Sequence, residues 1–191
     1  MLMDIIKSRH SIRKYTKKQI DVKDLEKILE AGIYAPNAGG GQRSMMVALH
    51  NAELAAKIGR LNLLKFDRTH LAGNFVSDEQ PSTIDNPNIK NGFYDAPTVI
   101  CIFCQKDFLF NTADAFCCAE NMILQAKELN IDSCIISRGE ETFENPEGRK
   151  LLKEWNVPEN YICKAFVILG YIDGPQPKSK PRKQNRFLIV E

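Results

Sequence analysis

The sequence predicts an α+β fold in a single domain that spans residues 1–191. Candidate helices and strands interleave along the chain, but without the regular alternation that builds a parallel, doubly wound sheet. A length of 191 residues suits one domain and allows a substantial buried core. The composition, with 43% hydrophobic and 26% charged residues, is typical of a soluble globular protein.

Charge and hydropathy argue against several classes of protein. A formal net charge of +2 is too small to indicate nucleic acid or a membrane surface as a partner. No apolar run approaches the ~20 residues that cross a bilayer. Residues 1–7 lack the basic start and apolar middle of a signal peptide. We therefore expect a cytoplasmic protein that binds neither nucleic acid nor membrane.

The six cysteines are expected to be reduced thiols that pack as small hydrophobic residues. Cys101 and Cys104 form a C-x-x-C within a continuous apolar run. Residues three apart in a strand point to opposite faces, so these two sulfur atoms cannot pair there. Cys117 and Cys118 are adjacent within a helical pattern. We expect no metal site among them.

The first part of the chain predicts two helices around a short strand. Asp21 is a candidate N-cap, and apolar residues follow it at helical spacing to Ile33, before Pro36. Residues 45–49 have the composition of a strand. Residues 52–64 carry a second apolar stripe at helical spacing.

Residues 65–95 have no regular period and are rich in Asn, Asp and Ser. An irregular segment of this length in a compact domain is either functional or disordered, so we expect a lid-like loop. Its aromatic residues fit a lid over a flat ligand, and they equally fit anchors that pack the segment on the core. They are Phe66, Phe75, Phe93 and Tyr94.

The second half predicts three strands and two helices. Residues 98–103 form an apolar strand, and residues 112–129 form a helix that is apolar on nearly all sides. Such a helix must be buried, either in the core or in a subunit interface. A strand at 133–137, a helix from 145 to about 155 and a strand at 161–172 follow.

Residues 173–191 are predicted to form a C-terminal arm. The arm contains prolines and a basic stretch, and it ends in the apolar, strand-like residues 187–190. An apolar strand at the end of an arm needs a sheet edge to join, which a partner subunit can supply. The arm therefore indicates a homodimer.

Three motifs carry chemistry, and the first is the basic run at residues 9–13. Arg9 and Arg13 offer planar forks for a phosphate, and Ser11 offers a further donor. The alternative interpretation is a basic turn that closes the first helix, where cations offset the helix dipole.

The second motif is the loop at residues 35–42. Its three glycines, residues 39–41, let the backbone approach a flat ligand closely. It is neither a P-loop nor a dinucleotide fingerprint, because no Gly-Lys-Ser/Thr follows it and no strand precedes it. The third motif is the basic stretch at 178–183. The loop at 35–42 and the basic stretch at 178–183 are each also compatible with a solvent-exposed connecting segment that binds nothing.

The order and positions of the three motifs resemble the FMN-dependent nitroreductase family. The resemblance rests on Arg-x-Ser-x-Arg near the start, Ala-Pro-Asn-x₄-Gln about two dozen residues later, and Lys-x-Arg before the final apolar segment. It implies a mixed sheet flanked by helices. It also implies a dimer in which each C-terminal arm is exchanged onto the partner.

The resemblance also implies roles for individual residues. Arg9, Ser11, Lys180 and Arg182 match positions that hold the flavin phosphate, and His10 adjoins them. Arg13 matches a basic position near the pyrimidine edge of the ring. The remaining matched positions are Pro36, Asn37, Ala38 and Gln42, which contact the ring from the other subunit, and Ser137, Arg138 and Gly139, whose backbone passes over the dimethylbenzene side.

The implied activity is an FMN-dependent oxidoreductase that passes a hydride from NAD(P)H to a flat acceptor, such as a nitroaromatic or a quinone, in a ping-pong scheme. No protein acid or nucleophile is needed, because the flavin carries the chemistry. The glycines before Gln42 and the Ser137-Arg138-Gly139 turn depart from the family's usual residues. The altered loop after Gln42 and the unusual length of residues 65–95 leave open an alternative, a flavin-binding carrier, sensor or partner-binding module without NAD(P)H turnover.

Overall fold

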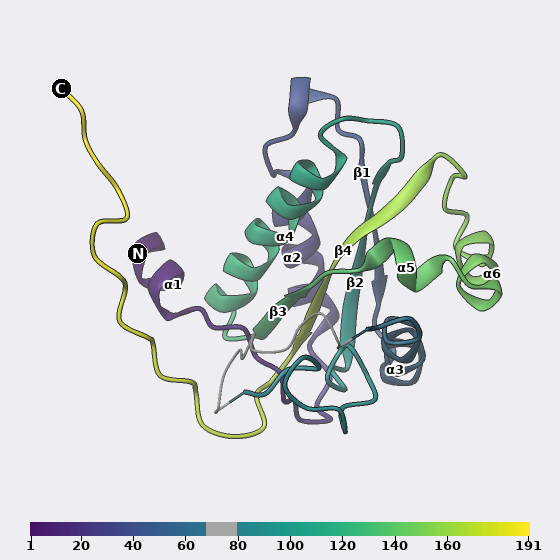
Figure 1. The fold of residues 1–191 in the computed structure, drawn as a ribbon, viewed down its shortest axis with the longest axis horizontal. Helices are drawn as coiled ribbons and strands as arrows, with labels where there is room; N and C mark the ends of the chain where they lie inside the picture. Colours follow the sequence, from purple (N-terminus) through teal and green to yellow (C-terminus); the bar gives the residue numbers. More distant parts are fainter. Residues whose placement is uncertain (68–79) are drawn as a thin grey trace.

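The computed structural model describes residues 1–67 and 80–191, in which four antiparallel strands lie between two layers of helices (Figure 1). The strand order is β1-β2-β4-β3. The two longest strands, β2 (Thr98–Gln105) and β4 (Tyr161–Gly170), occupy the centre. β1 (Ser44–Leu49) and β3 (Asp132–Ile136) lie at the edges.

The helices divide between the two faces of the sheet (Figure 1). α2 (Val22–Ile33) and α4 (Asn111–Glu128) cover one face. α3 (Ala52–Leu61), α5 (Gly139–Phe143) and α6 (Pro146–Glu154) cover the other. The short α1 (Leu2–Ser8) and the C-terminal arm lie beyond α4 (Figure 1). Among the described residues, no helix has both the length and the apolar character that a membrane span requires.

The side chains of β2 alternate between the two faces of the sheet, so this strand contributes to a core on each side. Consecutive strand residues point to opposite faces, so odd and even positions enter different clusters. Val99, Cys101 and Phe103 pack in the core on the α3 side, while Ile100, Ile102 and Cys104 pack in the core on the α4 side. The prediction that Cys101 and Cys104 point apart is therefore confirmed, and all six cysteines are free thiols.

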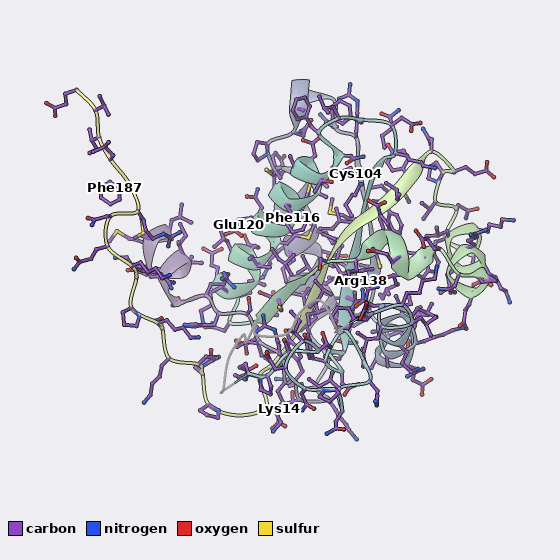
Figure 2. The ribbon with its side chains drawn as sticks, viewed as in Figure 1. Lys14, Cys104, Phe116, Glu120, Arg138 and Phe187 are labelled. Carbon is purple, nitrogen blue, oxygen red and sulfur yellow. The ribbon has the colours of Figure 1, made fainter. Side chains whose placement is uncertain are left out.

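The long helix α4 is buried in the core on one side, as its apolar sequence predicted. Ala115, Ala119 and Met122 are fully buried against the sheet. Phe116 and Glu120 project from the opposite side, toward α1 and the arm (Figure 2). The helix is thus a core element that also presents an exposed aromatic residue.

The expected mixed sheet was wrong for the described residues, because the four strands pair antiparallel throughout. The parallel pairing in this part of the chain is an isolated bridge between Ser11 and Ser133. The apolar residues 187–190 add no strand to their own sheet, because the arm runs outward past α1 (Figure 1). Phe187 at the start of this segment is 87% exposed (Figure 2).

The predicted irregular segment lies partly outside the described residues, which omit residues 68–79 and with them Phe75. Residues 80–95 consist of turns without helix or strand. Phe93 is fully buried, and its ring centroid lies 4.8 Å from that of Phe166. For this aromatic residue the prediction of an anchor on the core is confirmed.

Candidate functional site

The two ends of the sequence form a cleft of about 220 Å³, which we call the basic cleft. It brings together six of the residues predicted to bind a ligand, and no aspartate or glutamate is among the lining residues of the described chain. A cleft with this lining favours an anion. The predicted residues that line it are Arg9, His10, Ser11, Arg13, Lys180 and Arg182.

Side chains alternate in direction along the N-terminal segment, and this alternation explains why Ser11 and Arg13 point to the same side of it. Ile12 is fully buried in the core, so its neighbours Ser11 and Arg13 face outward. The Ile12 N–H donates to the Ser133 carbonyl at 3.0 Å, which ties the segment to β3. The arm is fixed in turn by the Asp173 N–H, which donates to the Lys14 carbonyl at 3.0 Å.

His10 links the two segments directly. Its Nε2 lies 3.0 Å from the Ser179 hydroxyl of the arm. Its Nδ1 is buried and has no hydrogen-bond partner within the described chain. A buried polar atom without a partner is costly, and His10 is one of the residues that line the basic cleft.

The cations around the cleft also act on the thiol beneath it. Burial raises the pKa of the Cys134 thiol, and Arg13, a hydrogen bond with Ser11, and Arg9 oppose that rise. Three residues of the N-terminal motif therefore lie within interaction range of a single atom at the centre of β3.

A second cleft of about 160 Å³, the inner cleft, continues from the basic cleft because Arg13 lines both. The end of β3, residues 134–138, forms one wall, and Asn62, Phe66 and Tyr94 contribute to the other. Ser137 and Arg138, which the resemblance placed beside the ring, therefore adjoin the residues that the resemblance placed around the phosphate.

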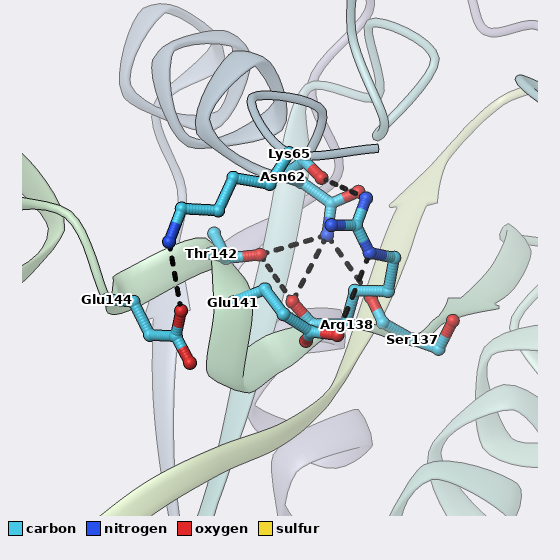
Figure 3. Close-up of polar contacts among 7 residues, drawn as sticks. All are labelled: Asn62, Lys65, Ser137, Arg138, Glu141, Thr142 and Glu144. Carbon is cyan, nitrogen blue, oxygen red and sulfur yellow. Dashed lines mark hydrogen bonds and ion pairs between the residues drawn. The ribbon is translucent and has the colours of Figure 1, made fainter. Parts of the chain in front are cut away.

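A hydrogen-bond network around Asn62 fixes the end of β3 (Figure 3). The Asn62 side chain is 4% exposed, and its Nδ2 donates to the Ser137 carbonyl at 3.1 Å and to Thr142 Oγ1 at 2.9 Å. Arg138 Nη1 donates back to the Asn62 carbonyl at 3.0 Å. Asn62 could not be predicted as part of the site from the sequence, because an asparagine after a helix is equally common in an exposed turn.

Arg138 adopts an unusual backbone conformation, with φ of 66° in the left-handed region. Its guanidinium lies over the Phe66 ring in the wall of the inner cleft, 4.9 Å from the ring centroid, and its Nε lies 3.8 Å from Glu141 Oε1. The neighbouring Gly139 is required by packing, since an added Cβ would lie 2.6 Å from the Cys163 carbonyl oxygen.

The loop at residues 36–42 is not brought to the basic or inner cleft of its own chain. Asn37 and Gln42 line a separate cleft of about 100 Å³. The Ala38 N–H donates to Asp114 Oδ1 at 3.0 Å, which anchors the loop on the buried start of α4. Pro36 and Gln42 are exposed, so a second subunit can reach them.

Comparison with known proteins places this arrangement in a family. The model of the nitroreductase family matches residues 6–171. A proposed NADH dehydrogenase/NAD(P)H nitroreductase of Archaeoglobus fulgidus is 27% identical over 172 residues, 88% of this chain and 84% of that protein. The iodotyrosine deiodinase of Thermotoga neapolitana is 22% identical over 183 residues, 93% of this chain and 92% of its own length.

A solved structure agrees with the match. The crystal structure of a nitroreductase with bound FMN from Bacteroides fragilis superposes with a TM-score of 0.83 at 31% identity, covering 100% of this chain and 98% of that chain. Since the family model spans most of the sequence and this structure matches its full length, the chain belongs to the nitroreductase family.

Proposed function

We propose that this protein is an FMN-dependent oxidoreductase that passes a hydride from NAD(P)H to a flat acceptor, such as a nitroaromatic or a quinone. The observation that carries the proposal is the basic cleft, where Arg9 and Ser11 meet Lys180 and Arg182 from the other end of the chain. Guanidinium groups match the oxygens of a phosphate, and among the described residues no carboxylate lines the cleft to compete with it.

The two connected clefts suit the two ends of FMN. The phosphate would lie in the basic cleft, beside the unpartnered Nδ1 of His10, and the ring in the inner cleft. Arg13 lines both, so its positive charge would stabilise negative charge on a reduced ring. When bound, FMN would accept a hydride from the donor and return it to the acceptor.

The chain's own residues bind and orient in this scheme. Asn62 and Thr142 hold the carbonyls of Ser137 and Arg138 in place, so the wall of the inner cleft is set before a ligand arrives. We assign no residue as a general acid or nucleophile.

We further propose a homodimer with exchanged arms. The apolar residues 187–190 are largely exposed, and α4 presents the exposed Phe116. A groove of about 380 Å³ between α1 and α4 adds to this apolar surface. A second copy would cover these residues and bring its exposed Pro36 and Gln42 to the ring of the first.

The visible spectrum tests the function. We expect a yellow protein whose colour bleaches when NADH or NADPH is added without oxygen. A yellow protein that neither donor bleaches would favour a flavin-binding carrier or sensor. A colourless protein that cannot be reconstituted with FMN contradicts both functions.

A further inference from the structure

A third cleft, the outer cleft, adjoins the inner cleft and has a volume of about 610 Å³. Arg13 and Tyr94 line both clefts, so the two share a wall. The volume lies in the range of small-molecule sites, about 300–1,000 Å³. The proposed FMN position leaves this cleft free for another molecule.

The outer cleft carries more positive than negative charge. Its cations are Arg13, Lys14, Arg60 and Lys90, and its carboxylates are Asp95 and Asp173. Asp173 Oδ2 is paired with Lys14 Nζ at 3.1 Å, and Asp95 Oδ1 accepts from Asn91 Nδ2 at 2.8 Å.

Asp95 is the only other carboxylate in the described lining, so the cations of the outer cleft outnumber its carboxylates. Within the described chain, neither the guanidinium of Arg13 nor that of Arg60 forms an ion pair. Lys90 Nζ donates one hydrogen bond to the Pro87 carbonyl at 3.0 Å and keeps two further protons. With Arg13 assigned to the ring, Arg60 and Lys90 are the cations of the outer cleft that can bind a further anion.

The wall that carries Lys90 is fixed on α3, directly beside Arg60. Asn91 is 7% exposed and fits over Gly59, where an added Cβ would lie 1.7 Å from Asn91 Oδ1. The Gly92 N–H donates to the Gly59 carbonyl at 2.8 Å. These contacts hold the backbone of residues 91–92 against α3 and so keep the exposed Lys90 near the exposed Arg60.

Backbone strain marks the same wall. Tyr94 and Asp95 are consecutive non-glycine residues in the left-handed region, with φ of 53° and 59°. Such residues cost free energy, and they persist where the surrounding structure holds them and often where function needs them. The strained pair lies where the inner and outer clefts meet.

We propose that the outer cleft binds the anionic group, a phosphate or a carboxylate, of the molecule that reacts at the inner cleft. Arg60 and Lys90 would hold this group, since charge-assisted bonds to such oxygens are among the strongest in proteins. The inference rests on the proposed function, because the ring position in the inner cleft makes the outer cleft its neighbour. The anion belongs either to the NAD(P)H donor or to an acidic acceptor.

Isothermal titration calorimetry tests the proposal without turnover. The double variant Arg60→Ala/Lys90→Ala is compared with the wild-type protein and with Arg149→Ala, an exposed arginine on α6 far from the three clefts. The titrants are NADP⁺, para-nitrobenzoate and the neutral para-nitrobenzamide. FMN retention in each variant is measured separately.

We expect the double variant to weaken binding of at least one anion about tenfold or more, and to change binding of the neutral amide less than about twofold. Loss for NADP⁺ assigns the cleft to the donor, and loss for para-nitrobenzoate assigns it to the acceptor. If the wild-type protein binds neither anion more tightly than the double variant does, the proposal is overturned. If the purified protein does not bind FMN, the proposed function is contradicted. Calorimetry still measures whether Arg60 and Lys90 bind the anion, so the two outcomes can be told apart.

Discussion

Replacing Asn62 with alanine removes the amide that holds the end of β3 against the turn after α3. The Ser137 carbonyl loses its donor at 3.1 Å, whereas Thr142 Oγ1 keeps its own bond to the Arg138 carbonyl. The hydrogen bonds of the Asn62 amide to Ser137 and Thr142 contribute about 1 kcal/mol each, so we expect a loss of stability of about 2 kcal/mol. For a chain of this size, that loss lowers the melting temperature by about 4–8 °C.

Thermal unfolding followed by circular dichroism measures this effect. The matched control is Asn160→Ala, which truncates an exposed asparagine before β4 and is expected to change stability by less than about 0.5 kcal/mol. Asn62→Ala is also expected to weaken FMN binding, because Ser137 and Arg138 line the inner cleft. If both variants melt at the same temperature, the network does not hold the strand end and the reasoning is refuted.

Three further predictions concern the backbone, the arm and the thiols. Arg138→Gly is expected to be more stable than Arg138→Ala by about 1 kcal/mol in urea unfolding, because glycine carries no penalty for a φ of 66°; equal stabilities would argue against strain. Phe187→Asp combined with Ile189→Asp is expected to shift dimers to monomers in light scattering, and an unchanged mass would contradict arm exchange. Burial raises the pKa values of the Cys101, Cys134 and Cys163 thiols above 9.0, so the unfolded chain loses these protons first. The free energy of unfolding should therefore fall above about pH 9, by up to about 1.4 kcal/mol per pH unit for each of the strongly raised thiols, Cys101 and Cys163; a flat profile from pH 9 to about pH 11 would refute this.

Local signals allowed the helix starts and the central strands to be predicted. Asp21 and Asn145 were predicted as N-caps, and their side chains accept from the N–H groups of Lys23 and Gly148. The apolar run at 98–103 predicted β2 because a strand covered on both faces has no polar positions. Strand direction was not predictable, because the partners of β2 are β1 and β4, which are both distant in sequence, and no local pattern encodes those pairings.

For the candidate site too, residues in local sequence motifs could be predicted, whereas residues that depend on long-range contacts could not. Arg9, Ser11, Lys180 and Arg182 could be identified because their residue types and positions form recognisable motifs at both ends of the chain. Asn62 could not be identified, because its role depends on contacts with residues 137–142, which are distant in sequence. Arg60 and Lys90 were likewise not identifiable, since only the docking of residues 88–95 on α3 brings them to one cleft.

The most direct measurement is the difference in affinity between FMN and riboflavin, which lacks the phosphate. Arg9→Ala and Arg182→Ala are each expected to weaken FMN binding about tenfold or more, and to change riboflavin binding less than about twofold. The two substitutions should also couple in a double-mutant cycle, because both side chains line the basic cleft. Equal losses for FMN and riboflavin, or no loss for either, would contradict the convergence of both chain ends on one phosphate.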